Sequence, residues 1–109
     1  MDYTEELQQG ILLLRLEGNL DMLNAGILKE RMMQAVNSDH SNIVLDLSNV
    51  GFVDSSGFGL LILINERLKS QGKNRLRIAN VSRSIQQVFR ISKISDVVDV
   101  FTSLDDAMK

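Results

Sequence analysis

Two adjacent serines, Ser55 and Ser56, follow Asp54 in the middle of the chain. A hydroxyl in such a setting can cap a helix, act as a nucleophile or accept a phosphate. The apolar run at residues 60–64, with polar residues after it, predicts a mostly buried helix that begins at these serines. Ser55 or Ser56 is then the predicted N-cap of that helix.

A phosphate at Ser55 is compatible with that position. A helix N-terminus favours negative charge by about 0.3–1 kcal/mol, although Asp54 repels the same group. The modification adds about −1.5 to −2 charges without unfolding the protein. Gly57 and Gly59 each cost the helix about 1 kcal/mol relative to Ala, so they indicate close packing or close approach by another backbone. The alternative interpretation is an ordinary serine cap beside turn glycines.

The sequence offers little support for catalysis. His40 is the only histidine, and it precedes the strand that Ser55 follows, so it lies at the opposite end of that strand. Gly57 and Gly59 are not followed by the third glycine of a dinucleotide fingerprint, and no phosphate-binding loop or set of metal ligands is spaced correctly. We therefore predict no enzyme activity, no cofactor and no metal.

Composition indicates one ordinary globular domain. The chain has 109 residues, 44% of them hydrophobic, and a net charge of −2, which does not favour nucleic-acid binding. It contains no cysteine and hence no disulfide. The acidic N-terminus lacks the apolar core of a signal peptide, and the longest apolar run, 58–64, is too short to span a membrane. We expect a single cytoplasmic, monomeric domain over residues 1–109, with no membrane partner.

Alternating strand patterns and helical patterns succeed one another along the chain. Strand–helix–strand units predict parallel pairs with right-handed crossovers, and Gln9 and Gly10 predict a hairpin turn. Helices are expected to begin at Asn24, at the two serines, at Ser82 or Ser84, and at Thr102 or Ser103. The predicted strands are 3–8, 11–17, 43–47, 75–79 and 97–101.

Charged residues mark one face of several strands. Arg15, Glu17, Asp46, Arg75 and Arg77 fall opposite the apolar positions. A parallel sheet covered on both faces would be apolar throughout. We therefore predict an α/β fold with a mixed sheet of four to five strands, helices mainly on one face, and a partly solvated opposite face.

Two loops are expected to meet at the carboxyl ends of the parallel strands, at residues 18–24 and 50–57. Asp21 and Asp54 could pair there with basic groups of a partner protein. Apolar contact area could come from Leu20, Met22, Phe52 and Phe58. The alternative is that these side chains, Phe52 above all, pack beneath their own loops.

Residues 45–48 and 53–59 resemble the signature of the anti-sigma factor antagonists, bacterial members of the STAS domain family. The family pattern is hydrophobic-Asp-Ser-Ser/Thr/Ala-Gly-hydrophobic-Gly, and its first serine, which is phosphorylated, matches Ser55. The segment 18–21 resembles the family's Gly-Glu-Leu-Asp, so Asp21 matches a residue of the partner-binding surface. The chain departs from the family pattern at Asn19, Arg83, Gln87 and Lys93, which leaves the identity of the partner open.

The resemblance implies a function. In this family a kinase that is also an anti-sigma factor phosphorylates the motif serine with its own bound ATP, and a metal-dependent phosphatase removes the phosphate. The unphosphorylated antagonist binds the kinase and releases the sigma factor.

On that basis Ser55 is the phosphoacceptor, Asp54 and Ser56 shape its site, and Gly57 and Gly59 allow a partner to approach. The partner surface would then comprise Asp21, Leu20, Met22, Asp54, Ser56, Gly57 and Phe58. Two alternatives stay open: a STAS adaptor with a non-sigma output in secretion, biofilm formation or second-messenger signalling, and an enzyme or small-ligand carrier.

Overall fold

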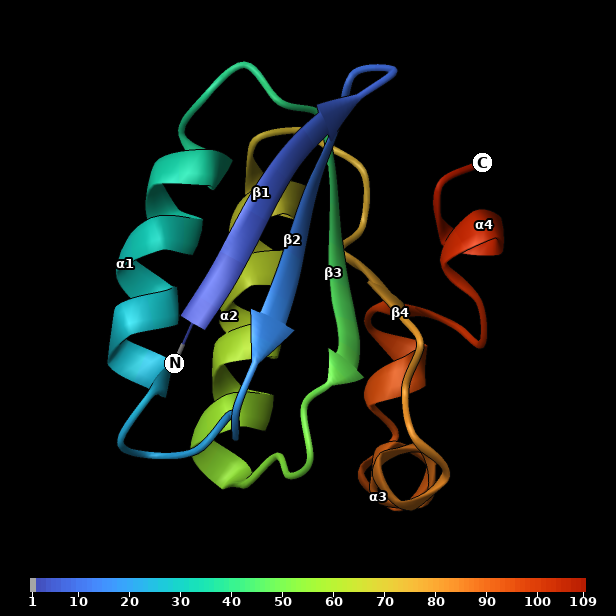
Figure 1. The fold of residues 1–109 in the computed structure, drawn as a ribbon. Helices are drawn as coiled ribbons and strands as arrows, with labels where there is room; N and C mark the ends of the chain where they lie inside the picture. The colour runs from blue at the N-terminus through green and yellow to red at the C-terminus, as the bar shows by residue number, and fades with distance from the viewer. Residues whose placement is uncertain (1) are drawn as a thin grey trace.

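One mixed sheet of five strands forms the centre of the protein in the computed structural model, which describes residues 2–109 (Figure 1). The strands lie in the order β1-β2-β3-β4-β5, the same as their order in the chain. This confirms the predicted α/β class. The strands are β1 (Asp2–Gln8), β2 (Ile11–Glu17), β3 (Asn42–Asn49), β4 (Arg77–Ala79) and β5 (Asp99–Phe101).

Only the first strand pair is antiparallel. β1 and β2 form a hairpin whose turn residues, Gln9 and Gly10, both have positive φ angles of 53° and 78°. Two consecutive positive angles are typical of a type I′ turn, which matches the twist of the flanking strands. All later neighbours in the sheet are parallel, as the strand–helix–strand pattern predicts.

Three helices cover one face of the sheet. Leu28 of α1, Ile64 of α2 and Phe89 of α3 are buried in one cluster with the apolar side chains of β2 and β3. In Figure 1, α2 lies behind the sheet with α1 beside it on the left, and α3 lies at the lower right, below β4. The helices are α1 (Ala25–Val36), α2 (Ser55–Ser70) and α3 (Arg83–Ser92), with a short 3₁₀ helix, η1 (Ile94–Asp96), after α3.

The opposite face is covered in part by the last helix, α4 (Leu104–Ala107). Ile11, Leu13 and Val44 are buried in a second, smaller cluster with Ala107 of α4. Most of the helical mass therefore lies on one face, as predicted, and a single helical turn lies on the other.

Asp46 corrects the prediction of a solvated charged position on that second face. Its side chain is only 4% exposed. One carboxylate oxygen accepts hydrogen bonds from the backbone N–H of Ser48, at 2.9 Å, and from Nδ2 of Asn80, at 3.2 Å. These bonds satisfy a buried carboxylate and tie the end of β3 to the segment that leads into α3.

None of the helices formed by residues 2–109 combines the length and the hydropathy that a membrane crossing requires.

Candidate functional site

The loops that follow β2 and β3 are bonded to each other along their length. The backbone N–H of Leu20 donates to the carbonyl of Phe52 at 2.8 Å, and the N–H of Asp54 donates to the carbonyl of Leu20 at 3.1 Å. Leu20 and Val53 also form a parallel bridge. The two segments predicted to converge thus form one continuous surface at the carboxyl ends of the parallel strands.

Asp54 is the N-cap of α2, which corrects the prediction of a serine cap. Its backbone is extended, with φ −97° and ψ −173°, and its Oδ1 accepts a hydrogen bond from the N–H of Gly57 at 3.0 Å. Its second oxygen, Oδ2, accepts from the N–H of Met22 at 3.0 Å. One carboxylate therefore caps the helix and holds the neighbouring loop.

Ser55 is consequently the first residue of α2, and its side chain is not needed as a cap. It is exposed, and its hydroxyl makes no hydrogen bond to any residue in 2–109. Ser56, one position further, is half-buried and likewise makes no side-chain hydrogen bond within this part of the chain. The exposed hydroxyl of Ser55 is therefore accessible to a modifying enzyme.

Gly57 and Gly59 differ in their surroundings, although both belong to the first turns of α2. A Cβ atom added at Gly57 would lie 2.5 Å from the carbonyl oxygen of Leu20 and 2.8 Å from Cγ1 of Val53. The close approach predicted at Gly57 is thus made by the chain's own loop and not by a partner. At Gly59 an added Cβ would meet nothing within 4 Å, so this position stays open to a partner.

The apolar residues of the site fall into two groups. Leu20 is completely buried, so the prediction that it offers contact area to a partner is wrong for its side chain. Met22 and Phe52 are exposed, by 76% and 54%. Phe58 is half-buried, and its ring meets the ring of Phe89 edge-on at a centroid distance of 5.3 Å.

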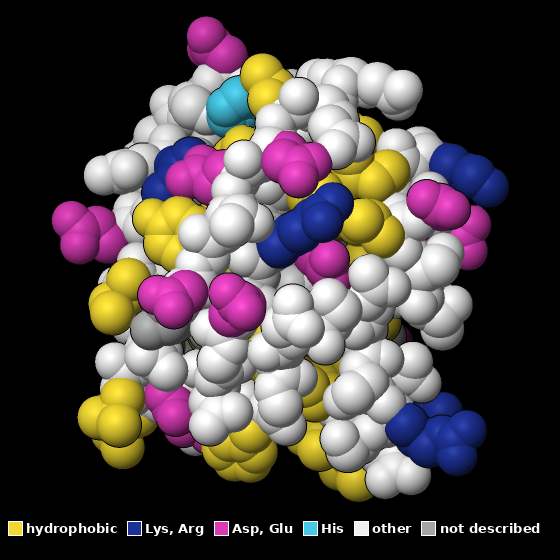
Figure 2. Space-filling model, in the orientation of Figure 1, with side chains coloured by type: hydrophobic (Ala, Val, Ile, Leu, Met, Phe, Trp, Pro, Cys, Tyr) yellow, Lys and Arg dark blue, Asp and Glu magenta, His cyan; other side chains and the backbone are white. Residues whose placement is uncertain are grey.

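Sequence reasoning missed two further exposed apolar residues, one in the loop of Asp21 and one in the first turn of α1. Leu23 and Ile27 are 87% and 51% exposed. Ile27 lies off the apolar stripe of α1, whose buried members include Leu28 and Met32, so its position in the helical pattern could have revealed it. Figure 2 shows hydrophobic side chains along its lower edge, where the loops after β2 and β3 lie in Figure 1.

Asp21 organises the loop that leads into α1. Its Oδ1 accepts hydrogen bonds from the N–H groups of Leu23 and Asn24, at 3.1 and 3.2 Å. Its carbonyl accepts from the N–H of Ala25 at 2.8 Å. Asn24 occupies the N-cap position as predicted, but its side chain does not cap the helix and donates instead to the carbonyl of Asn19 at 2.9 Å.

The surroundings of Ser55 are shallow. A groove of about 210 Å³ between α1 and α2 is lined by Ser56 and Gly59, and a hollow of about 80 Å³ lies against Phe52 and Phe58. Both are smaller than the ~300–1,000 Å³ typical of small-molecule pockets. Residues 2–109 contain no group of three or more His, Asp and Glu side chains arranged to hold a metal ion.

Fold and site together define a small α/β domain with an exposed serine at the start of the helix that follows its central strand. The chain belongs to the STAS domain family, whose model matches residues 4–107.

Its relatives agree with the predicted resemblance to anti-sigma factor antagonists. The chain is 27% identical over 104 residues to the anti-sigma F factor antagonist of Paenibacillus polymyxa, covering 94% of this chain and 88% of that protein. An anti-sigma factor antagonist from Mycobacterium paratuberculosis has a similar structure, with a TM-score of 0.89 and 21% identity over 98% of this chain and 90% of that one. The phosphorylated form of the Bacillus cell fate determinant SpoIIAA superposes with a TM-score of 0.74 at 21% identity, covering 98% and 96% of the two chains.

Proposed function

We propose that this chain is a phosphorylation-controlled partner-switching regulator. Unphosphorylated at Ser55, it binds an anti-sigma factor that is also a serine kinase and relieves the inhibition of a sigma factor. The kinase transfers a phosphate to Ser55, which ends the binding, and a metal-dependent serine phosphatase restores the active form. The protein acts in the cytoplasm as a monomer and catalyses nothing itself.

The observation that supports this proposal most directly is that Asp54, and not Ser55, caps α2. Asp54 caps α2, and the Ser55 hydroxyl is exposed without a hydrogen-bond partner in the described part of the chain. A serine that caps a helix has its hydroxyl oxygen engaged by a backbone N–H, so it is less available to a kinase. Here a phosphate can be added at the first turn of α2 while the cap stays in place.

The same geometry explains how a phosphate would end binding. The exposed side chains of Met22 and Phe52 belong to the two bonded loops that lead to Asp54 and Ser55, and they supply apolar contact area. A phosphate in that surface adds bulk and about two negative charges beside Asp54. Desolvating uncompensated charge at a contact costs several kcal/mol, which is enough to release a partner.

Supporting evidence also comes from the relatives. The P. polymyxa protein is named an antagonist of an anti-sigma factor, and SpoIIAA has been seen in a phosphorylated form. According to this proposal, the protein that is released when this chain binds its partner is a sigma factor. The alternative is a STAS adaptor with a different output, and identifying the protein that the kinase releases distinguishes the two.

Intact-mass spectrometry of the protein isolated from its native cells tests the switch. We expect one added phosphate in the wild type and in Ser56→Ala, and none in Ser55→Ala. Cells that lack the candidate phosphatase are included so that a short-lived phosphate is retained. No phosphate under any growth condition would overturn the switch and leave a constitutive binding domain.

A further inference from the structure

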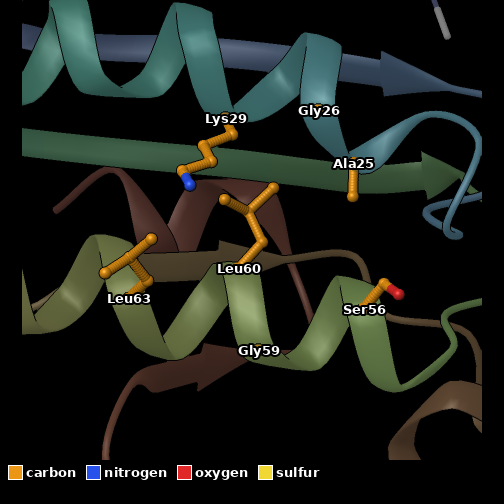
Figure 3. A pocket seen from close by; sticks show the side chains of 7 residues that line it. All are labelled: Ala25, Gly26, Lys29, Ser56, Gly59, Leu60 and Leu63. Carbon is orange, nitrogen blue, oxygen red and sulfur yellow. The ribbon is translucent and has the colours of Figure 1, made fainter.

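A groove between α1 and α2 opens beside the candidate phosphorylation site. It has a volume of about 210 Å³, and Leu60 and Leu63 form its apolar wall on α2. Ala25 and Gly26 of α1 and Gly59 of α2 contribute almost no side chain, so the groove stays open (Figure 3). Its size suits one apolar side chain, since a cavity of about 150 Å³ already accommodates benzene.

One charged residue, Lys29, lines the groove. Figure 3 shows its side chain extending from α1 toward α2, where its ammonium group lies near Leu60. Lys29 makes neither an ion pair nor a hydrogen bond with any residue in 2–109. An unpaired cation beside an apolar groove is complementary to an apolar side chain that has a carboxylate close by.

The groove is continuous with the surface around Ser55. Ser56, the neighbour of Ser55, lines its end, so a partner seated over Ser55 can reach into it. The open space above Gly59 also allows a partner's backbone to approach α2 closely.

We propose that this groove is the specificity pocket of the partner-binding surface. It accepts an apolar side chain of the partner kinase, and an Asp or Glu within one helical turn of that side chain pairs with Lys29. The proposal rests on the proposed partner-switching function and adds to it the chemistry of the partner segment. Lys29 selects the partner by charge, and the groove selects it by shape.

Photo-crosslinking in the native cells tests the shape and chemistry of the occupant. A photoreactive diazirine analogue of leucine, which is close to leucine in size and leaves the groove open, replaces Leu63 in the groove wall, and it replaces Leu7 as a control, since Leu7 is 64% exposed on β1. Mass spectrometry reads the crosslinked peptide. We expect the partner peptide crosslinked at position 63 to contain an apolar residue with an Asp or Glu within about one helical turn of it. Absence of a crosslink, the same crosslink from Leu7, or a peptide without a carboxylate would overturn the proposal.

Charge reversal tests the role of Lys29. We expect Lys29→Glu to lower the yield of that crosslink at least about tenfold, and Lys29→Arg to retain it, because like charges at a contact are strongly unfavourable. Lys69→Glu is the matched control: Lys69 is also exposed and makes no ion pair with the described residues, but it lies near the far end of α2. Thermal melts verify that each variant is folded. An unchanged yield in Lys29→Glu would overturn the pairing.

The same cells separate failure of the groove from failure of the switch. If Ser55 carries phosphate but the crosslink ignores Lys29→Glu, the switch stands and the groove proposal is wrong. If Ser55 never carries phosphate yet the crosslink at position 63 has the expected composition and charge dependence, the groove proposal stands and the switch is overturned.

Discussion

Asp54 holds the candidate site together, because its two carboxylate oxygens bind two different segments. One oxygen caps α2 at the N–H of Gly57, and the other fixes the loop before α1 at the N–H of Met22. This arrangement leaves Ser55 exposed at the first position of the helix. The Asp54 side chain thus both holds the two segments in place and leaves the Ser55 hydroxyl accessible.

Removing that carboxylate should loosen both segments. We expect Asp54→Ala to lower the free energy of unfolding by about 1–2 kcal/mol, because the helix loses its cap and Met22 loses an acceptor. Asp54→Asn should cost less, since one side-chain oxygen remains to cap α2. Urea denaturation measures both variants, and Ser55→Ala, with no hydrogen bond to lose, should stay within about 0.5 kcal/mol of the wild type. A larger loss in Ser55→Ala than in Asp54→Ala would contradict this assignment of the cap.

The two glycines of α2 give an internal comparison in stability. Gly57→Ala should destabilise the protein by about 1–3 kcal/mol, because the new Cβ would lie 2.5 Å from the backbone oxygen of Leu20. Gly59→Ala should stabilise it by about 0.4–1 kcal/mol, because the position is helical and unobstructed. Urea denaturation of the two variants should give shifts of opposite sign. Equal shifts would mean that the loop of Leu20 moves aside at little cost.

The sequence predicted which residues belong to the site, but not which of them caps α2 or which are buried. Asp54, Ser55 and Ser56 are all good N-cap residues, so the local sequence does not decide among them. The decision depends on Met22, more than thirty positions earlier, whose N–H holds the Asp54 side chain in place. Leu20 likewise appears in a polar loop segment, and only the contact with Gly57 shows that it is buried.

At the scale of elements, an ion pair joins the edge strand β1 to α1. Nε of Arg31 donates to Oε2 of Glu5 at 2.8 Å, and a second guanidinium nitrogen binds the other carboxylate oxygen. The hydrogen bond from Arg31 lowers the pKa of Glu5 below its ordinary value of 4.5, although partial burial acts in the opposite direction. Because β1 has a strand on one side only, this pair helps to fix its position.

The sign of the shift determines the pH dependence of stability. A carboxylate whose folded-state pKa is lowered contributes stability above its unfolded pKa, and that stability is lost as the pH falls through the folded value. Glu5→Gln should therefore reduce the free energy of unfolding by about 0.5–1 kcal/mol at pH 7, and the difference should disappear as the pH falls through the lowered pKa of Glu5. Denaturation at several pH values measures it. Glu6→Gln is the control, since Glu6 meets Arg15 only at 3.7 Å and both side chains are over 40% exposed. An equal loss in the two variants, or one that persists at low pH, would contradict the pairing.

Elements were more predictable than single contacts, because each has a repeating pattern. The alternation in β2 and the hairpin signal at Gln9 and Gly10 lead directly to the observed strand and turn. Boundaries were less certain: β4 begins at Arg77, two residues later than predicted. The side chain of Arg75 instead donates to the carbonyl of Val97, a contact that no local pattern reveals.

At the scale of the whole molecule, the two faces of the sheet are covered by helices to very different extents. Three helices bury one face, whereas the other depends on α4, a helix of four residues. The sequence predicted the short helix but not where it docks, so this face of the sheet was expected to be partly solvated. Docking depends on long-range contacts, such as Nη1 of Arg77 donating to the carbonyl of Ala107 at 3.0 Å.

A charge placed at Ala107 tests whether α4 can leave that face independently. Ala107 is fully buried against Ile11, Leu13 and Val44, so an aspartate there would be an uncompensated buried charge. Undocking one short helix costs less than burying that charge, so we expect Ala107→Asp to release α4 while the five-stranded sheet stays folded. The free energy of unfolding should fall by about 2–3 kcal/mol, on the order of burying one large apolar side chain.

Amide hydrogen exchange separates local release from global loosening. In Ala107→Asp, residues 104–109 should lose protection while β2, β3 and α2 retain it, and the exposed face of β2 should favour self-association at high concentration. Asp105→Ala, a change at an exposed position of the same helix, should leave both protection and oligomeric state unchanged. Equal loss of protection throughout the sheet would instead show that α4 is part of one cooperative unit. Since the Ser55 surface depends on loops bonded to each other and to α2, partner binding should survive in Ala107→Asp if the release is local.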